Sequence, residues 1–233
     1  MILKSRQLLT ALNWKLIFFF PDLIPSSPAL LPVNSYKTIQ SACEGIYTDS
    51  GSKFIAYGHP ISTDADLKTQ KELLKKMHPK AVHIVSASRQ GFAGEIEKSS
   101  DDGEPSGSAG KPVLNEMKRW NITNAGLFVV RYFGGKKLGI PGLINAYGTA
   151  ASNCLDSAKI EVVSVKEGYR IICNEKDSSL VIHELHKAGV KILDMEFGET
   201  CNFKIECERA QNEKIIKRLT ALWQIKFEHL YSA

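Results

Sequence analysis

The stretch that most constrains the fold of this chain runs from Asp101 to Pro112 and reads DDGEPSGSAGKP. Its closely spaced glycines, prolines and small polar residues follow neither the period of a helix nor that of a strand. Glycine permits backbone conformations that other residues avoid, and proline fixes its own φ, so this segment is shaped through its main chain. A backbone shaped in this way usually lies against the rest of the fold or against a ligand.

A second glycine-rich segment runs from Arg131 to Gly139 and reads RYFGGKKLG. A guanidinium, two aromatic rings and two ammonium groups beside a flexible loop suit contact with phosphates and stacking on a base or a sugar. The helix expected next would add free backbone amides at its N-terminus. A second interpretation is that Arg131 pairs with an acidic residue of segment 101–104 and fixes the two loops together. The two interpretations are compatible.

The two segments resemble the signature of the IMPACT (YigZ) family. That signature reads roughly Asp-Gly-Glu-Pro-Ser-Gly-small-Ala-Gly-Lys-Pro, followed by Arg-Tyr-Phe-Gly-Gly-x-x-Leu-Gly and then by Gly-Leu and Ala-Tyr, which here are residues 142–143 and 146–147. The resemblance covers about residues 36 to 233. One departure is Ile140-Pro141, where many members carry small residues; Pro141 stiffens the loop and favours the start of a helix.

The resemblance implies an α+β protein of two domains, and residues 1–35 fall outside it. We expect these first residues to be a weakly structured extension. Residues 36–163 would form an IMPACT N-terminal domain with a left-handed β-α-β unit, similar to the second domain of ribosomal protein S five and to domain IV of elongation factor G. Residues 165–233 would resemble the ferredoxin-like domain V of that factor, and the expected element order β-α-β-β-α-β agrees.

Hydrophobic periodicity and turn residues predict the individual elements. The stretch 90–107 is expected to be one long loop, and Ser108 or Gly110 is expected to cap the helix that follows it. In the first domain we expect strands at 43–48, 53–59, 81–88, 125–133 and 160–164 and helices at 64–77, 110–120 and 143–158. In the second domain we expect strands at 169–173, 190–197, 201–207 and 224–231 and helices at 177–188 and 211–222.

Composition restricts the compartment and the partners. Hydrophobic residues make up 43% and charged residues 24% of the 233 residues, as in ordinary soluble globular proteins. The five cysteines show no metal or redox spacing, which is typical of buried thiols in a reducing compartment, so we expect a cytoplasmic protein. The apolar run 14–20 is too short to span a bilayer. Residues 36–160 contain 16 Lys+Arg and 12 Asp+Glu, a net +4 that is compatible with an RNA or ribosome partner.

The acidic and histidine residues allow two interpretations. Asp101, Asp102 and Glu104 either perform acid–base or cation-binding chemistry, or form an acidic turn that also caps the following helix. His78 and His83 would need further ligands to hold a metal; we expect one to be structural and the other exposed. We predict no catalytic residue, no metal site and no cofactor.

We predict a non-catalytic, translation-associated regulator that binds RNA, the ribosome or a translation-related protein. The resemblance implies this link because eukaryotic members regulate translation through the amino-acid-starvation kinase pathway; they carry a different second module, so only the general link is carried over. The alternative is an enzyme that acts on a small phosphorylated or acyl substrate in the cleft between loops 101–111 and 131–142. A third reading, a protein-interaction module, would show an exposed apolar patch. The candidate contact residues are Lys111, Arg131, Tyr132, Phe133, Lys136 and Lys137, and the signature loop comprises Asp102, Gly103, Glu104, Pro105, Ser106 and Gly107.

Overall fold

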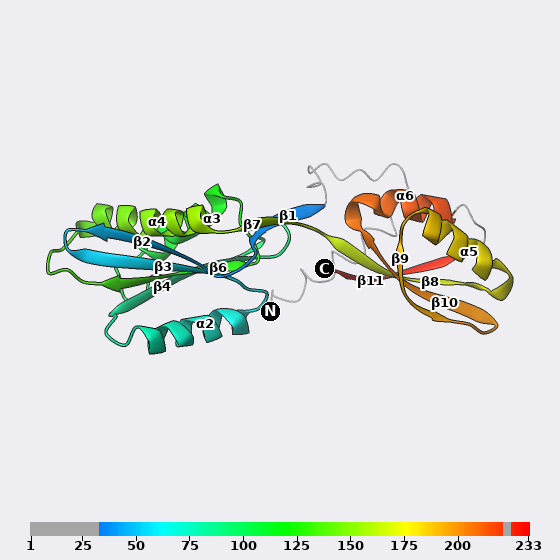
Figure 1. The fold of residues 1–233 in the computed structure, drawn as a ribbon, viewed down its shortest axis with the longest axis horizontal. Helices are drawn as coiled ribbons and strands as arrows, with labels where there is room; N and C mark the ends of the chain where they lie inside the picture. Colours follow the sequence, from blue (N-terminus) through cyan, green and yellow to red (C-terminus); the bar gives the residue numbers. More distant parts are fainter. Residues whose placement is uncertain (1–32, 221–224) are drawn as a thin grey trace, which may run out of the picture. The chain divides into compact units, whose positions relative to one another are not determined.

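The computed structural model of the protein describes residues 33–220 and 225–233. Helices and β-sheets form an α+β fold, as predicted (Figure 1). Most of the predicted extension, residues 1–32, lies outside the described residues. Strand β1 (Ser35–Ile39) begins at the last residue assigned to that extension and pairs antiparallel with β7 (Ile160–Ser164).

A five-stranded antiparallel sheet with the order β2-β3-β6-β4-β5 forms the centre of the first part of the chain. Strands β6 and β4 are buried along almost their whole length because helices cover both faces of the sheet (Figure 1). Helices α3 and α4 lie on one face, over the larger apolar core, and α2 lies on the other. The strands are β2 (Cys43–Asp49), β3 (Ser52–Pro60), β4 (His83–Gln90), β5 (Ile96–Ser100) and β6 (Ala125–Tyr132).

Helix α2 (Asp64–Met77) has the predicted bounds, and its start is explained by a capping box. Thr63 Oγ1 accepts the Asp66 N–H, and the Asp66 carboxylate accepts the Thr63 N–H in return. The buried stripe of α2 is narrow. Leu74 is buried, but Met77 is 64% exposed because it lies in the last turn, beyond the sheet contacts of Leu74.

Helices α3 (Gly110–Arg119) and α4 (Gly139–Ser157) carry the residues that face the larger core. Helix α4 begins at Gly139, four residues before the predicted start. The reason is that Pro141 stands in the first turn of the helix, where its missing N–H breaks no intrahelical hydrogen bond.

The prediction of one long loop over residues 90–107 was wrong, because β5 lies within it. This strand pairs antiparallel with the edge of β4, from Gln90↔Ile96 to Ser86↔Ser100. All five of its residues are exposed, so the apolar alternation that marks a half-buried strand is missing from its sequence. Charged residues on such an edge strand oppose pairing with other chains.

The last part of the chain forms a four-stranded antiparallel sheet with the order β11-β8-β10-β9. This order and the β-α-β-β-α-β sequence confirm the ferredoxin-like prediction. Alternate residues of the two central strands face the apolar core, as the period of a strand requires. Residues 221–224, where helix 211–222 was predicted to end and the last strand to begin, lie outside the described residues. The elements are β8 (Lys166–Asn174), α5 (Glu175–Lys187), β9 (Lys191–Glu196), β10 (Thr200–Glu208), α6 (Arg209–Thr220) and β11 (Lys226–Ser232).

Candidate functional site

Asp101 directly precedes the signature loop and caps the N-terminus of α3. Its Oδ2 accepts the N–H of Gly107 at 2.8 Å, and its Oδ1 accepts the N–H groups of Ala109 and Gly110 at 3.1 and 2.8 Å. Burial opposes ionisation of this carboxyl, but the three N–H donors outweigh it and lower its pKa below the usual value. Ser108 and Gly110 were the wrong cap residues, whereas the interpretation of the acidic residues as a turn that caps the following helix is confirmed for Asp101. The Ser108 hydroxyl instead donates to Pro105 O, and the cap comes from a residue that precedes the loop.

Asp102 joins the same loop to two other elements. Its Oδ2 accepts the N–H of Ile84 on β4 at 2.8 Å, and its Oδ1 pairs with Lys71 Nζ on α2 at 2.7 Å. Burial opposes ionisation here as well, but these contacts lower the pKa of the carboxyl. The backbone carbonyl of Asp102 also contacts His83 Nδ1 at 2.7 Å, so His83 takes part in the loop's own hydrogen bonding.

Glu104 forms a buried ion pair with Arg131. Glu104 Oε1 accepts from Arg131 Nη1 at 2.6 Å and from the Tyr147 hydroxyl at 2.7 Å, and the two charged side chains are only 4% and 9% exposed. Burial, and then the hydrogen bond to Glu104, raise the pKa of Tyr147 far above its usual value. The guanidinium also lies 5.6 Å from the ring centres of Phe54 and Phe133. The interpretation in which Arg131 pairs with the acidic loop is therefore confirmed.

The three acidic side chains of segment 101–104 thus contact different parts of the fold. Asp101 holds α3, Asp102 holds α2 and β4, and Glu104 holds β6 and α4. Over the described residues there is also no group of His, Cys, Asp and Glu side chains that could hold a metal ion.

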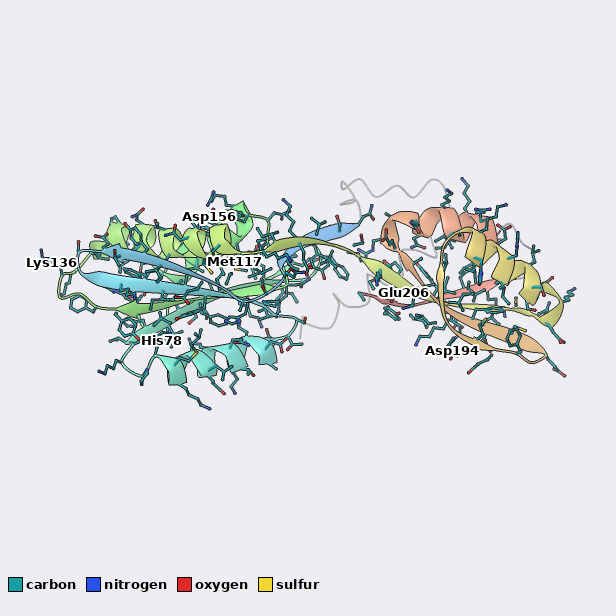
Figure 2. All side chains as sticks on the ribbon, in the orientation of Figure 1. His78, Met117, Lys136, Asp156, Asp194 and Glu206 are labelled. Carbon is teal, nitrogen blue, oxygen red and sulfur yellow. The ribbon has the colours of Figure 1, made fainter. Side chains whose placement is uncertain are left out.

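His78 lies at the C-terminal end of α2 (Figure 2). Its ring contacts two tyrosines. Its Nδ1 is 2.8 Å from the Tyr132 hydroxyl and its Nε2 is 2.9 Å from the Tyr57 hydroxyl. Burial raises the pKa of Tyr57, and the nearby Glu44 carboxylate adds to this. Both histidines that sequence reasoning singled out are therefore hydrogen-bonded and partly buried, and the expectation that one would be exposed was wrong. The tyrosine partners of His78 were missed because they lie on strands 21 and 54 residues away.

The six candidate contact residues divide into two groups. Arg131 is buried in its ion pair, and Tyr132 is partly buried against His78. The other four, Lys111, Phe133, Lys136 and Lys137, are exposed. Phe133 is 55% exposed, so its ring is accessible at the start of the loop. Lys136 lies in the loop at the end of the sheet (Figure 2).

The loop between β6 and α4 is held against the β2–β3 turn. The Gly134 N–H donates to Ser52 Oγ at 3.1 Å, and a Cβ on Gly134 would lie 1.9 Å from the backbone carbon of Gly51. This close approach fixes the position of Gly134 at the start of the loop that carries Lys136 and Lys137. Helix α4 then begins without a side-chain cap and without an acidic residue in its first turn, which leaves backbone N–H groups available to an anion.

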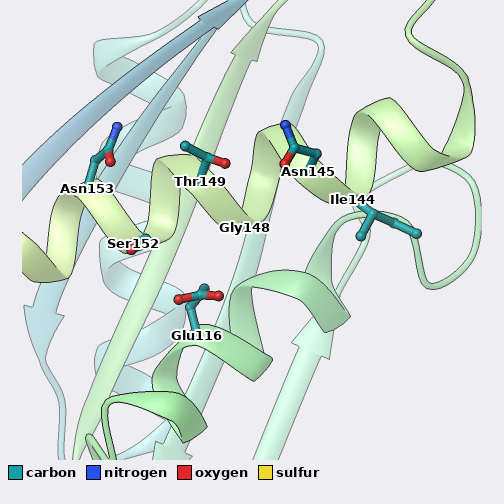
Figure 3. A pocket seen from close by; sticks show the side chains of 7 residues that line it. All are labelled: Glu116, Ile144, Asn145, Gly148, Thr149, Ser152 and Asn153. Atoms are coloured by element: carbon teal, nitrogen blue, oxygen red, sulfur yellow. The ribbon is translucent and has the colours of Figure 1, made fainter.

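A groove of about 330 Å³ lies between α3 and α4 (Figure 3). It runs along the outer surface of the two helices and does not lie between the two glycine-rich loops, where the enzyme alternative placed a cleft. Ile144 lines the groove and is 44% exposed, and Ile140, one turn earlier on α4, is 54% exposed. The lining residues are Glu116, Ile144, Asn145, Gly148, Thr149, Ser152 and Asn153.

Comparison with known proteins identifies the family. A sequence model of the Impact N-terminal domain matches residues 50–155. The IMPACT family member YvyE of Bacillus subtilis is 33% identical over 193 residues, which cover 82% of this chain and 88% of YvyE. The chain belongs to the IMPACT family. The IMPACT family member YigZ of Escherichia coli is 30% identical over 149 residues, covering 63% of this chain and 72% of YigZ.

The same fold is also seen in a solved structure of a hypothetical protein. It superposes with a TM-score of 0.63 over 86% of this chain and 99% of its own, at 22% sequence identity. At that identity the likeness concerns the fold alone. For this IMPACT-family chain, no helix among the described residues is long and apolar enough to cross a membrane.

Proposed function

We propose that this IMPACT-family protein acts in translation as a non-catalytic regulator that binds ribosomal RNA. Lys136 and Lys137 would contact phosphates, and the exposed ring of Phe133 would stack on a base. Lys111, exposed in the first turn of α3, would add a further phosphate contact. The general link to translation rests on family membership, since the eukaryotic members are regulators of translation.

One observation carries the proposal. Phe133, Lys136 and Lys137 are exposed on one loop, and that loop leads into a helix whose first turn has neither a side-chain cap nor an acidic residue. Neither lysine has an ion-pair partner among the residues that the structure describes. Charge, a stacking surface and free amides therefore lie close together. Arg131 and Tyr132 are assigned a different role, which is to hold the base of this loop.

The test measures binding of the full chain to ribosomes and to purified ribosomal RNA over a salt series. The double variant K136A/K137A should weaken binding and reduce the slope of log K against log salt by about 1 for each lysine that contacts a phosphate. Phe133→Ala should weaken binding by about 1–3 kcal/mol with little change in that slope. The matched control is K75A/K76A, an adjacent exposed lysine pair at the C-terminal end of α2. Equal effects of the two lysine pairs, or no binding at low salt, would contradict the proposal.

A protein partner is the second candidate, because Ile140 and Ile144 are exposed on one face of α4 beside the groove. Burial of these two side chains by a translation-related protein would be driven by the hydrophobic effect and would depend little on salt. Ile140→Ser with Ile144→Ser would then abolish binding, while K136A/K137A would change it little. The enzyme alternative has less support, because the carboxylates that it requires already form hydrogen bonds within the fold.

A further inference from the structure

Two cysteines far apart in the sequence lie in contact beside the larger core. Cys43 begins β2 and Cys154 lies in the last third of α4, yet their Sγ atoms are only 3.4 Å apart. Cys154 is completely buried, whereas Cys43 is only partly buried. Cys43 is therefore the more accessible residue of the pair, and Cys154 is enclosed by the core.

The surrounding backbone makes room for this contact. A Cβ on Gly58, which is paired with Cys43 across β2 and β3, would lie 2.5 Å from Cys43 Sγ. A Cβ on Gly45 would lie 2.2 Å from the backbone nitrogen of Cys154. Glycine at both positions lets β2 approach α4 closely enough for the two sulfurs to meet.

The two thiols also differ in acidity. The hydrogen bond from Cys154 lowers the pKa of the Cys43 thiol below its usual value, although partial burial opposes this. The same hydrogen bond, together with burial, raises the pKa of Cys154. The thiolate is the nucleophilic form of cysteine, so the more accessible sulfur is also the more reactive one.

We propose that Cys43 and Cys154 are a hydroperoxide-reactive pair that oxidises to an intramolecular disulfide. The Cys43 thiolate attacks one oxygen of hydrogen peroxide, the O–O bond breaks, and hydroxide leaves and takes up a proton to become water. Cys43 is then a sulfenic acid. The Cys154 sulfur attacks the Cys43 sulfur, an S–S bond forms, and the sulfenic oxygen leaves as a second water with the proton of Cys154. Two thiols are oxidised and one peroxide is reduced to two waters.

The experiment treats the full chain with hydrogen peroxide, blocks the remaining thiols with an alkylating reagent and maps tryptic peptides by mass spectrometry. Cleavage at Lys and Arg places Cys43 in peptide 38–53 and Cys154 in peptide 138–159. We expect these two peptides to be linked, with a loss of the mass of two hydrogen atoms, and we expect a reductant to release them. When the chain is unfolded in denaturant before alkylation, three of the five thiols should react after peroxide treatment, compared with five in the untreated chain.

An internal control lies in the four-stranded sheet. Cys173 and Cys201 face each other across β8 and β10, but both are buried, so peroxide should leave peptides 171–176 and 192–204 unlinked. The variant Cys154→Ser keeps a hydrogen-bond donor at this position but cannot form the disulfide. It should accumulate Cys43 sulfenic acid, which a cyclic diketone reagent traps. Five alkylatable thiols after treatment of the wild-type chain, or cross-links only between chains or at Cys173, would overturn the proposal, whether or not the variant folds.

Discussion

The Asp101 carboxylate accepts the backbone N–H of Gly110 at 2.8 Å, so the N-terminus of α3 is capped by a side chain from nine residues upstream. An ordinary N-cap residue adjoins its helix. Here the signature loop separates Asp101 from the helix. The Asp101 side chain therefore joins the two ends of this loop. The strength of this closure can be measured.

Asp101→Ala should lower the free energy of unfolding by about 1–2 kcal/mol, since an N-cap and its charge-assisted hydrogen bonds are lost. Urea unfolding followed by circular dichroism would measure the change. The control is Asp156→Ala, an exposed aspartate near the end of α4 whose Oδ2 accepts from Ser152 Oγ at a long distance of 3.5 Å. An effect no larger than that of the control would show that the cap contributes little.

Stability should fall with acid through Asp101 and Asp102. Their pKa values in the folded protein lie below the usual 3.8, so the unfolded chain binds more protons at low pH. Their contribution is complete above the usual pKa and is lost as the pH falls through the lower folded values. The double variant D101N/D102N should therefore show a shallower loss of stability below about pH 4 than the wild type. The measurement is the free energy of unfolding of both proteins between neutral pH and pH 2. An equal loss of stability with pH in the variant and the wild type would refute the prediction.

The Glu104–Arg131 pair should be strongly coupled because both side chains are buried. Removal of one partner leaves the other charged and unpaired, so E104Q and R131M should each cost about 3–5 kcal/mol. The double variant should cost less than the sum of the single variants, with a coupling of about 0.5–3 kcal/mol. The exposed pair Arg170–Glu228 is the control, and its coupling should stay below about 1 kcal/mol. Additive costs at Glu104 and Arg131 would contradict this.

Gly134→Ala should destabilise the protein by about 1–3 kcal/mol, because its Cβ would meet the backbone of Gly51, which cannot move aside as a flexible side chain can. Gly135→Ala is the comparison, since a Cβ there meets nothing within 4 Å and only the positive φ of 87° opposes it. The melting temperature should fall further for Gly134→Ala. The reverse order would mean that backbone conformation matters more here than the contact.

Local sequence signals predicted most of the fold. Hydrophobic periodicity predicted α2 with its observed bounds, and the order β-α-β-β-α-β predicted the ferredoxin-like sheet. Strand β5 could not be predicted because its five residues are exposed and are recognisable only through their pairing with β4. Strand β1 was missed for the same kind of reason, since it is specified by its partner β7.

The candidate site was harder to predict than the fold. The sequence places acidic, basic and aromatic residues in two loops, but it does not say which of them bond to each other. Arg131 and Lys136 look equivalent as positive residues near one loop, yet one is buried against Glu104 and the other is exposed. That difference depends on tertiary contacts such as the one between Glu104 and Tyr147, which are 43 residues apart.

The bonds of Asp101, Asp102 and Glu104 also affect how the signature can be used to compare proteins. Each of these carboxylates has a structural role, because its hydrogen-bond or ion-pair partners belong to the fold itself. A match at these three positions therefore predicts this loop geometry in another chain, but it does not predict what that chain binds. Differences in activity among such chains should be sought at Phe133, Lys136, Lys137, Ile140 and Ile144, whose side chains are exposed.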